Sequence, residues 1–95
     1  MDAEQLLAER LVLDERSFVE LVVWRLKSPL AGSAHDLKYR LAYIVDGVCA
    51  VRYDNEAGKG DHRHFGKREA VYQFTSLDAL QVDFWTDVDA WEKRK

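Results

Sequence analysis

Side chains suited to acid–base, phosphate or metal chemistry are concentrated in one stretch of this chain, from Tyr53 to His64. The stretch contains two of the three histidines and two of the five glycines, and no large apolar side chain lies between Tyr53 and Phe65. Loops held on a rigid scaffold are common places for functional groups. We therefore predict a polar, surface-exposed loop over residues 53–64 that begins where a strand over residues 48–53 ends.

The histidine, arginine and lysine side chains of this segment are the groups that RNA cleavage without a metal requires. One group takes the proton of the 2′-hydroxyl and another protonates the leaving oxygen, and imidazole titrates in the pH range that both steps need. Arginine suits the phosphate because its planar guanidinium matches the phosphate oxygens. The predicted catalytic residues are His62, His64, Arg63 and Asp61. The predicted substrate-binding residues are Lys59, Arg52, Arg40, Lys38, Asp54, Asn55 and Glu56.

Two other interpretations of the segment stay open. His62 and His64 stand two positions apart, so on an extended chain they point the same way, as two metal ligands would. Asp54, Glu56 and Asp61 would complete such a site. A hydrogen-bonded or solvated histidine pair is the simpler interpretation, and we predict a site without a metal or other cofactor.

Composition is that of an ordinary globular domain. Hydrophobic residues make up 47% and charged residues 33%, and we predict one domain over residues 1–95. The net charge of −3 gives no general attraction for nucleic acid, although a local basic face would suffice. The lone cysteine, Cys49, excludes an internal disulfide and fits a reducing compartment. We find no signal-peptide pattern and no apolar run of ~18 residues, so we expect a cytoplasmic protein without membrane contact.

The middle of the chain predicts a β-hairpin. Residues 18–27 are rich in β-branched and aromatic side chains, and residues 37–45 alternate as a strand does. Asp46-Gly47 then precedes the strand predicted over residues 48–53, and this dipeptide is a strong signal for a two-residue turn. Such a turn predicts the pairs Val45–Val48, Tyr43–Ala50, Leu41–Arg52 and Tyr39–Asp54.

The two ends of the chain complete the predicted fold. Residues 5–13 fit a helix or a strand, and we favour a strand because a turn-like segment and a clear strand follow. Residues 69–74 predict one more short strand. Thr75 or Ser76 caps a helix whose apolar face is formed by Leu77, Leu80, Phe84, Val88 and Trp91. We therefore predict an α+β fold: an antiparallel sheet of four to five strands with one C-terminal helix packed on it.

Four segments of the chain resemble a known family. They are Lys38-Tyr39-Arg40-Leu41-Ala42-Tyr43, Arg52-Tyr53-Asp54-Asn55-Glu56, Lys59-Gly60-Asp61-His62-Arg63-His64 and Asp83-Phe84-Trp85-Thr86-Asp87-Val88. With them the chain resembles, over most of its length, the TumE family of small bacterial toxin–antitoxin proteins. The resemblance implies a toxin encoded beside a helix-turn-helix antitoxin. It brings no catalytic assignment, so the ribonuclease prediction depends on the side chains above and on analogy with other small toxins.

We therefore predict a cytoplasmic toxin that a helix-turn-helix antitoxin neutralises and whose target is RNA. A non-catalytic binding module that sequesters a protein or nucleic acid is the alternative, and a metal-dependent nuclease is a third hypothesis. Trp24, Trp85 and Trp91 are expected in the core or at an interface, although they could stack on bases. The oligomeric state, including a homodimer, stays open.

Overall fold

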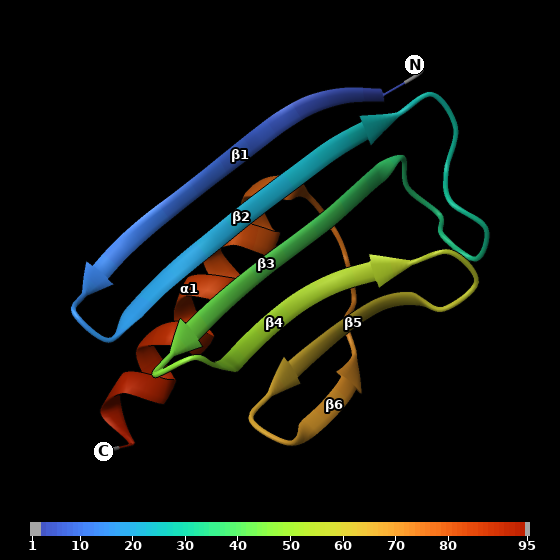
Figure 1. Ribbon diagram of the computed structural model, residues 1–95. Coiled ribbons are helices and arrows are strands. Elements are labelled where there is room, and N and C mark those ends of the chain that lie inside the picture. Colours follow the sequence, from blue (N-terminus) through green and yellow to red (C-terminus); the bar gives the residue numbers. More distant parts are fainter. Residues whose placement is uncertain (1–2, 95) are drawn as a thin grey trace.

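The computed structural model describes residues 3–94, in which an antiparallel sheet packs one face against a C-terminal helix (Figure 1). Its six strands follow one another across the sheet in chain order, so each strand pairs only with its neighbours in sequence. The elements are β1 (Ala3–Asp14), β2 (Ser17–Leu26), β3 (Leu37–Val45), β4 (Val48–Glu56), β5 (Gly60–Phe65), β6 (Arg68–Val71) and α1 (Leu77–Lys93).

The predicted α+β fold is confirmed, with six strands in residues 3–94 where four to five were expected. Residues 5–13 lie inside β1, so the strand was the right choice there. The strand predicted over residues 69–74 corresponds to β6, which ends at Val71. The additional strand is β5, and it falls inside the segment predicted to be a loop.

Helix α1 begins where its capping residue and apolar pattern predict it. The Ser76 hydroxyl accepts a hydrogen bond of 3.0 Å from the Ala79 N–H and thereby caps the first turn. Leu80, Phe84 and Val88 lie on one side of the helix and are buried against the sheet. No helix in residues 3–94 is long and apolar enough to cross a membrane.

The sheet has one covered face and one open face. Helix α1 lies behind β2, β3 and β4 in Figure 1, and the side chains between them form the core, with Tyr43, Tyr53 and Phe84 among the largest that are fully buried. The opposite face, which we call the open face, has no helix over it in residues 3–94 (Figure 1). Since side chains alternate along a strand, each strand sends every second residue to each face.

The β3–β4 hairpin turns at Asp46-Gly47 as predicted. Both residues have positive φ angles, 51° and 79°, which a type I′ turn requires and which an Asp-Gly pair adopts readily. The predicted pairing of Val45 with Val48 is confirmed. The turn therefore fixes the start of the hairpin register.

A β-bulge then shifts the rest of this hairpin by one residue. Tyr43 pairs with Val51 and not, as predicted, with Ala50. The predicted pairs Leu41–Arg52 and Tyr39–Asp54 are also wrong by one residue. The observed pairs are Ala42–Arg52, Leu41–Tyr53 and Arg40–Asp54. Since a slip of one residue exchanges the two faces of a strand, the bulge takes Arg52 out of the core and places it on the open face.

Every tyrosine of the chain donates its hydroxyl to a carboxylate, and three of the four carboxylates lie on α1. The pairs are Tyr53–Asp87 (2.6 Å), Tyr72–Asp83 (2.5 Å), Tyr39–Asp61 (2.6 Å) and Tyr43–Glu92. Burial, followed by the hydrogen bond to the carboxylate, raises the pKa of all four phenols above its usual range. The protonated phenols therefore help to hold α1 on the sheet.

We expect the protein to lose stability as the pH rises above about 10, the ordinary pKa of tyrosine in an unfolded chain. A group whose pKa is raised by folding contributes its full stability below the unfolded pKa and loses it as the pH rises further. Tyr53→Phe should melt at a lower temperature near neutral pH, because Asp87 loses a buried partner. Its melting temperature should also fall less steeply at alkaline pH. Circular dichroism melts test this, and equal slopes in the two proteins would contradict it.

Candidate functional site

The segment predicted to be a loop over residues 53–64 is a β-hairpin, so that prediction is wrong. β4 continues to Glu56 and β5 begins at Gly60, which leaves only residues 57–59 as a turn. The Gly58 N–H donates to the Ala31 carbonyl at 2.6 Å, and this bond ties the turn to the connection that precedes β3. The polar segment is therefore part of the rigid sheet.

Polar pairs across the strands account for the formation of this hairpin. Arg52 of β4 lies opposite His64 of β5, and Asp54 lies opposite His62. Charged and hydrogen-bonding groups at facing positions stabilise a strand pair. β5 therefore forms without the apolar alternation by which a strand is recognised in a sequence.

Strand alternation divides the four predicted catalytic residues between the two faces of the sheet. His62 and His64 point to the open face, in the same direction, as their spacing predicts. Asp61 and Arg63 point to the side that carries α1, where their partners lie. The structure thus brings the two histidines together and separates them from the other two residues.

Five polar side chains meet on the open face, and we call them the histidine cluster: Arg52, Asp54, His62, His64 and Glu69. Arg52 Nη2 lies 3.0 Å from His64 Nε2, and Arg52 Nε lies 3.2 Å from Asp54 Oδ2 without the geometry of a hydrogen bond. Glu69 Oε2 lies 3.3 Å from His64 Nε2 and 3.8 Å from His62 Nδ1. The histidine side chains are 23% and 25% exposed, so a ligand can reach rings whose positions are fixed by polar neighbours.

The contacts of the two imidazoles define what each can do with a proton. His62 Nε2 lies 2.8 Å from the Lys59 carbonyl, which can only accept, so Nε2 carries a proton. In the neutral ring Nδ1 is then an acceptor, and this buried atom has no hydrogen-bond partner among the described residues. His64 Nε2 accepts from Arg52 when the ring is neutral and donates to Glu69 when it is protonated. His62 Nδ1 is thus an unpaired acceptor, whereas His64 Nε2 lies between a guanidinium and a carboxylate.

Asp61 belongs to a hydrogen-bond network on the α1 side of the sheet. Its Oδ2 accepts from the Tyr39 hydroxyl at 2.6 Å and lies 2.8 Å from His35 Nε2. Because His35 Nδ1 accepts from the Leu37 N–H at 3.1 Å, Nε2 carries the proton and donates to Asp61. The His35 ring also packs on Phe74, with ring centres 3.9 Å apart. The network attaches the connection before β3 to strand β5.

Arg63 belongs to a second network on the α1 side. Its Nη2 donates to Asp87 Oδ2 at 2.7 Å, and its guanidinium carbon lies 5.7 Å from the centre of the Tyr53 ring. The same Asp87 oxygen accepts from the Tyr53 hydroxyl at 2.6 Å. One carboxylate of α1 therefore binds both strands of the β4–β5 hairpin.

Asn55 is buried, with 3% of its surface exposed, and its side-chain amide hydrogen-bonds to the backbone of β3. Its Oδ1 accepts from the Tyr39 N–H at 2.9 Å, and its Nδ2 donates to the Leu37 carbonyl at 2.8 Å. The backbone pairs of β3 and β4 end at Arg40 and Asp54. The Asn55 amide thus satisfies two buried backbone groups that have no partner strand residue.

Lys38 and Arg40 stand on the open face of β3, next to the histidine cluster. With Val22, Trp24 and Tyr39 they line a shallow groove of about 100 Å³. Within residues 3–94, Lys38 has no ion-pair partner. The groove therefore combines an aromatic side chain with cations that can meet an anionic ligand.

Glu56 and Lys59 lie at the end of the β4–β5 hairpin, where their side chains pair at 3.5 Å and are both exposed. The residues proposed for a metal-dependent nuclease do not converge, because Asp61 lies on the opposite face from His62 and His64. In the described part of the chain there is no group of three or more His, Cys, Asp or Glu side chains placed to hold a metal ion.

Glu69 is the cluster residue that the sequence analysis missed. It lies opposite His64 because β5 and β6 are joined by the two-residue turn Gly66-Lys67, which pairs Phe65 with Arg68. Gly66 has a φ of 61°, as such a turn requires. Recognition of that turn in the sequence would have placed Glu69 beside His64.

Comparison with known protein families identifies the family of this chain. The family model described as Toxin TumE matches residues 2–92, which is most of the chain. The chain therefore belongs to the TumE family of toxins. No curated protein and no solved structure shows a significant match to it.

We expect Asn55→Ala to destabilise the protein by about 2–6 kcal/mol, because two buried backbone groups would lose their partners at about 1–3 kcal/mol each. Glu56→Ala is a matched control, since its exposed side chain should contribute within about 0.5 kcal/mol. Urea unfolding followed by circular dichroism measures both. A loss no larger in Asn55→Ala than in the control would contradict the structural role of this amide.

Proposed function

We propose that this toxin cleaves RNA without a metal ion and that the histidine cluster is its active site. Support comes from the two imidazoles on one face of β5, with Glu69 between them and Arg52 beside them. Residues two positions apart on a strand are separated by about 6.6 Å. That separation lets one phosphodiester lie between a base and an acid.

In this mechanism His62 is the general base and His64 the general acid. The exposed Glu69 side chain, which lies 3.8 Å from the buried Nδ1 of His62, turns aside when the substrate binds. The uncovered Nδ1 then takes the proton of the ribose 2′-hydroxyl, and the oxygen attacks the adjacent phosphorus. The bond from phosphorus to the 5′-oxygen breaks while protonated His64 gives its proton to that oxygen. The products are a 2′,3′-cyclic phosphate and a 5′-hydroxyl.

Charged neighbours of the imidazoles assist both steps. Arg52, which already contacts His64, can donate to the phosphate oxygens as they gain charge in the transition state. The Glu69 carboxylate lies within 4 Å of each ring, so it can form an ion pair with the imidazole that carries a positive charge during the reaction. Asp54 holds the Arg52 guanidinium from the other side.

The substrate in this proposal is single-stranded RNA that crosses the open face from β5 toward β2. Three strand spacings of about 4.8 Å and a register offset of two residues put the groove beside Trp24 about 16 Å from His62. A base can stack on Trp24 while Lys38 and Arg40 meet the phosphates next to it. We further propose that the toxin acts in the cytoplasm and that a helix-turn-helix antitoxin neutralises it, as the family resemblance implies.

His62→Ala and His64→Ala should each relieve the growth arrest caused by expression without the antitoxin. General acid–base groups contribute roughly 10²–10⁴-fold in rate, so single-turnover cleavage of a labelled RNA by purified protein should slow by that factor. The matched control is Arg10→Ala, an exposed residue of β1 that contacts Phe18 at the other edge of the sheet, three strands from the histidine cluster. Circular dichroism melts establish that the variants are folded. Folded histidine variants that stay fully toxic would refute the catalytic role and favour a binding module.

Cleavage should continue in excess EDTA, because imidazole and guanidinium groups supply the acid, the base and the positive charge. Replacing the ribose at the cleaved position by 2′-deoxyribose should abolish the reaction, since the attacking oxygen is removed. Mass spectrometry should find a 2′,3′-cyclic phosphate on the upstream product. Activity that EDTA removes and manganese or magnesium restores would instead assign the chemistry to carboxylates.

A further inference from the structure

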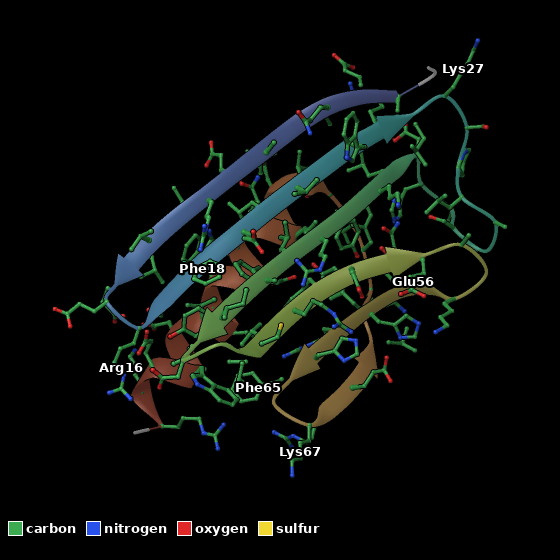
Figure 2. The ribbon with its side chains drawn as sticks, in the orientation of Figure 1. Arg16, Phe18, Lys27, Glu56, Phe65 and Lys67 are labelled. Carbon is green, nitrogen blue, oxygen red and sulfur yellow. The ribbon has the colours of Figure 1, made fainter. Side chains whose placement is uncertain are left out.

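A groove lies on the α1 side of the β5–β6 hairpin, on the opposite face from the two histidines of β5. Two adjoining hollows of about 430 and 620 Å³ share Phe65, Arg68 and Ala90 in their walls. Figure 2 shows Phe65 between the hairpin and the C-terminal end of α1, with Lys67 at the tip of the hairpin. We call this hollow the hairpin–helix groove.

Aromatic and backbone contacts fix the floor of the hairpin–helix groove. Phe65 packs edge-on against Trp91 of α1, with ring centres 5.2 Å apart. Gly66 lies so close that an added Cβ would be 3.2 Å from the Trp91 ring. The floor is therefore apolar and is held by contacts within the chain.

Cations surround this apolar floor. Lys67 and Arg68 line the groove from the hairpin, and Arg94 lines it from the end of α1, with its guanidinium 4.1 Å from the centre of the Trp91 ring. Within residues 3–94 none of these three side chains has an ion-pair partner. Since the chain as a whole carries −3, the groove is a local positive site on an acidic protein.

The groove borders an unpaired strand edge. β6 is the last strand of the sheet, and in residues 3–94 only β5 pairs with it. Its four residues are exposed, including Val71, which is 75% exposed on the open-face side. An edge of this kind offers backbone N–H and C=O groups to an incoming strand.

We propose that the edge of β6 and the hairpin–helix groove together bind an extended acidic segment of a protein partner. Alternate residues of an added strand point to alternate faces. One set would be acidic and would meet Arg68, Arg94 and Lys67 in the groove. The other set would be apolar and would pack beside Val71. This binding surface does not depend on whether the histidine cluster cleaves RNA.

A peptide fits this surface better than a nucleic acid does. Strand addition uses the backbone edge of β6, for which a nucleic acid has no matching backbone. The groove walls also include the carboxylates of Glu69 and Asp87, which oppose a continuous line of phosphates. A peptide with charge at every second residue can place its carboxylates on the cations and have no negative charge beside Glu69 and Asp87.

A short fluorescein-labelled peptide that alternates glutamate and valine serves as the probe. Its fluorescence polarisation with the full chain should rise on binding, and binding should weaken about tenfold in Arg68→Glu and in Arg94→Glu, where attraction becomes repulsion. Arg10→Glu, on β1 at the other edge of the sheet, is the control with the same change in charge. Arg68→Gln replaces Arg68→Glu if circular dichroism shows the latter unfolded.

Two further ligands test the two parts of the proposal separately: the addition of a strand to β6, and the preference for a peptide over a nucleic acid. A peptide with methyl groups on alternate backbone nitrogens should bind more weakly, since strand addition needs those N–H groups. A single-stranded RNA oligonucleotide should neither bind with the same dependence on Arg68 and Arg94 nor displace the peptide. Each of four results would overturn the proposal. They are absence of peptide binding, equal binding to the reversed-charge variants, unchanged binding of the methylated peptide, and displacement of the peptide by RNA. Ribonuclease activity does not enter any of these readouts.

Discussion

The hydrogen bonds from buried tyrosines to carboxylates are the constraint on which the arrangement of this protein depends. Asp83, Asp87 and Glu92 lie on α1, and Asp87, which is buried, would be costly there without a donor. The sheet and the segment after β6 supply those donors. Helix α1 can therefore lie in only one way, and the face of the sheet that it leaves uncovered is the face that carries the histidines.

Asp87 extends this constraint to the candidate site. It binds Tyr53 of β4 and Arg63 of β5 at once, so it sets the position of β5 relative to α1. His62 and His64 flank Arg63 in the chain and must point the other way. Arg63 was predicted to be catalytic, and its contacts with Asp87 and Tyr53 hold β5 from the face opposite the two imidazoles.

The parts of the fold that could be predicted from sequence have local signals. Ser76 and the apolar positions of α1 define the helix, and Asp46-Gly47 defines a turn because few other residue pairs accept its positive φ angles. β5 could not be predicted in this way, because it forms through polar pairs with β4. The bulge in β4 has no local signal either: it follows from whether Tyr53 or Arg52 enters the core, and only the complete sheet decides that.

The candidate site, too, has features with a local sequence signal and features without one. The spacing of His62 and His64 is enough to predict a shared direction, but Asp61 and Asn55 look equally polar and point into networks that hold the sheet. Glu69 links the two sides of the molecule, since it contacts both imidazoles and also lines the hairpin–helix groove. A ligand added along β6 would lie against this carboxylate. Any contact that turned Glu69 away would change the charged surroundings of both imidazoles without touching a histidine.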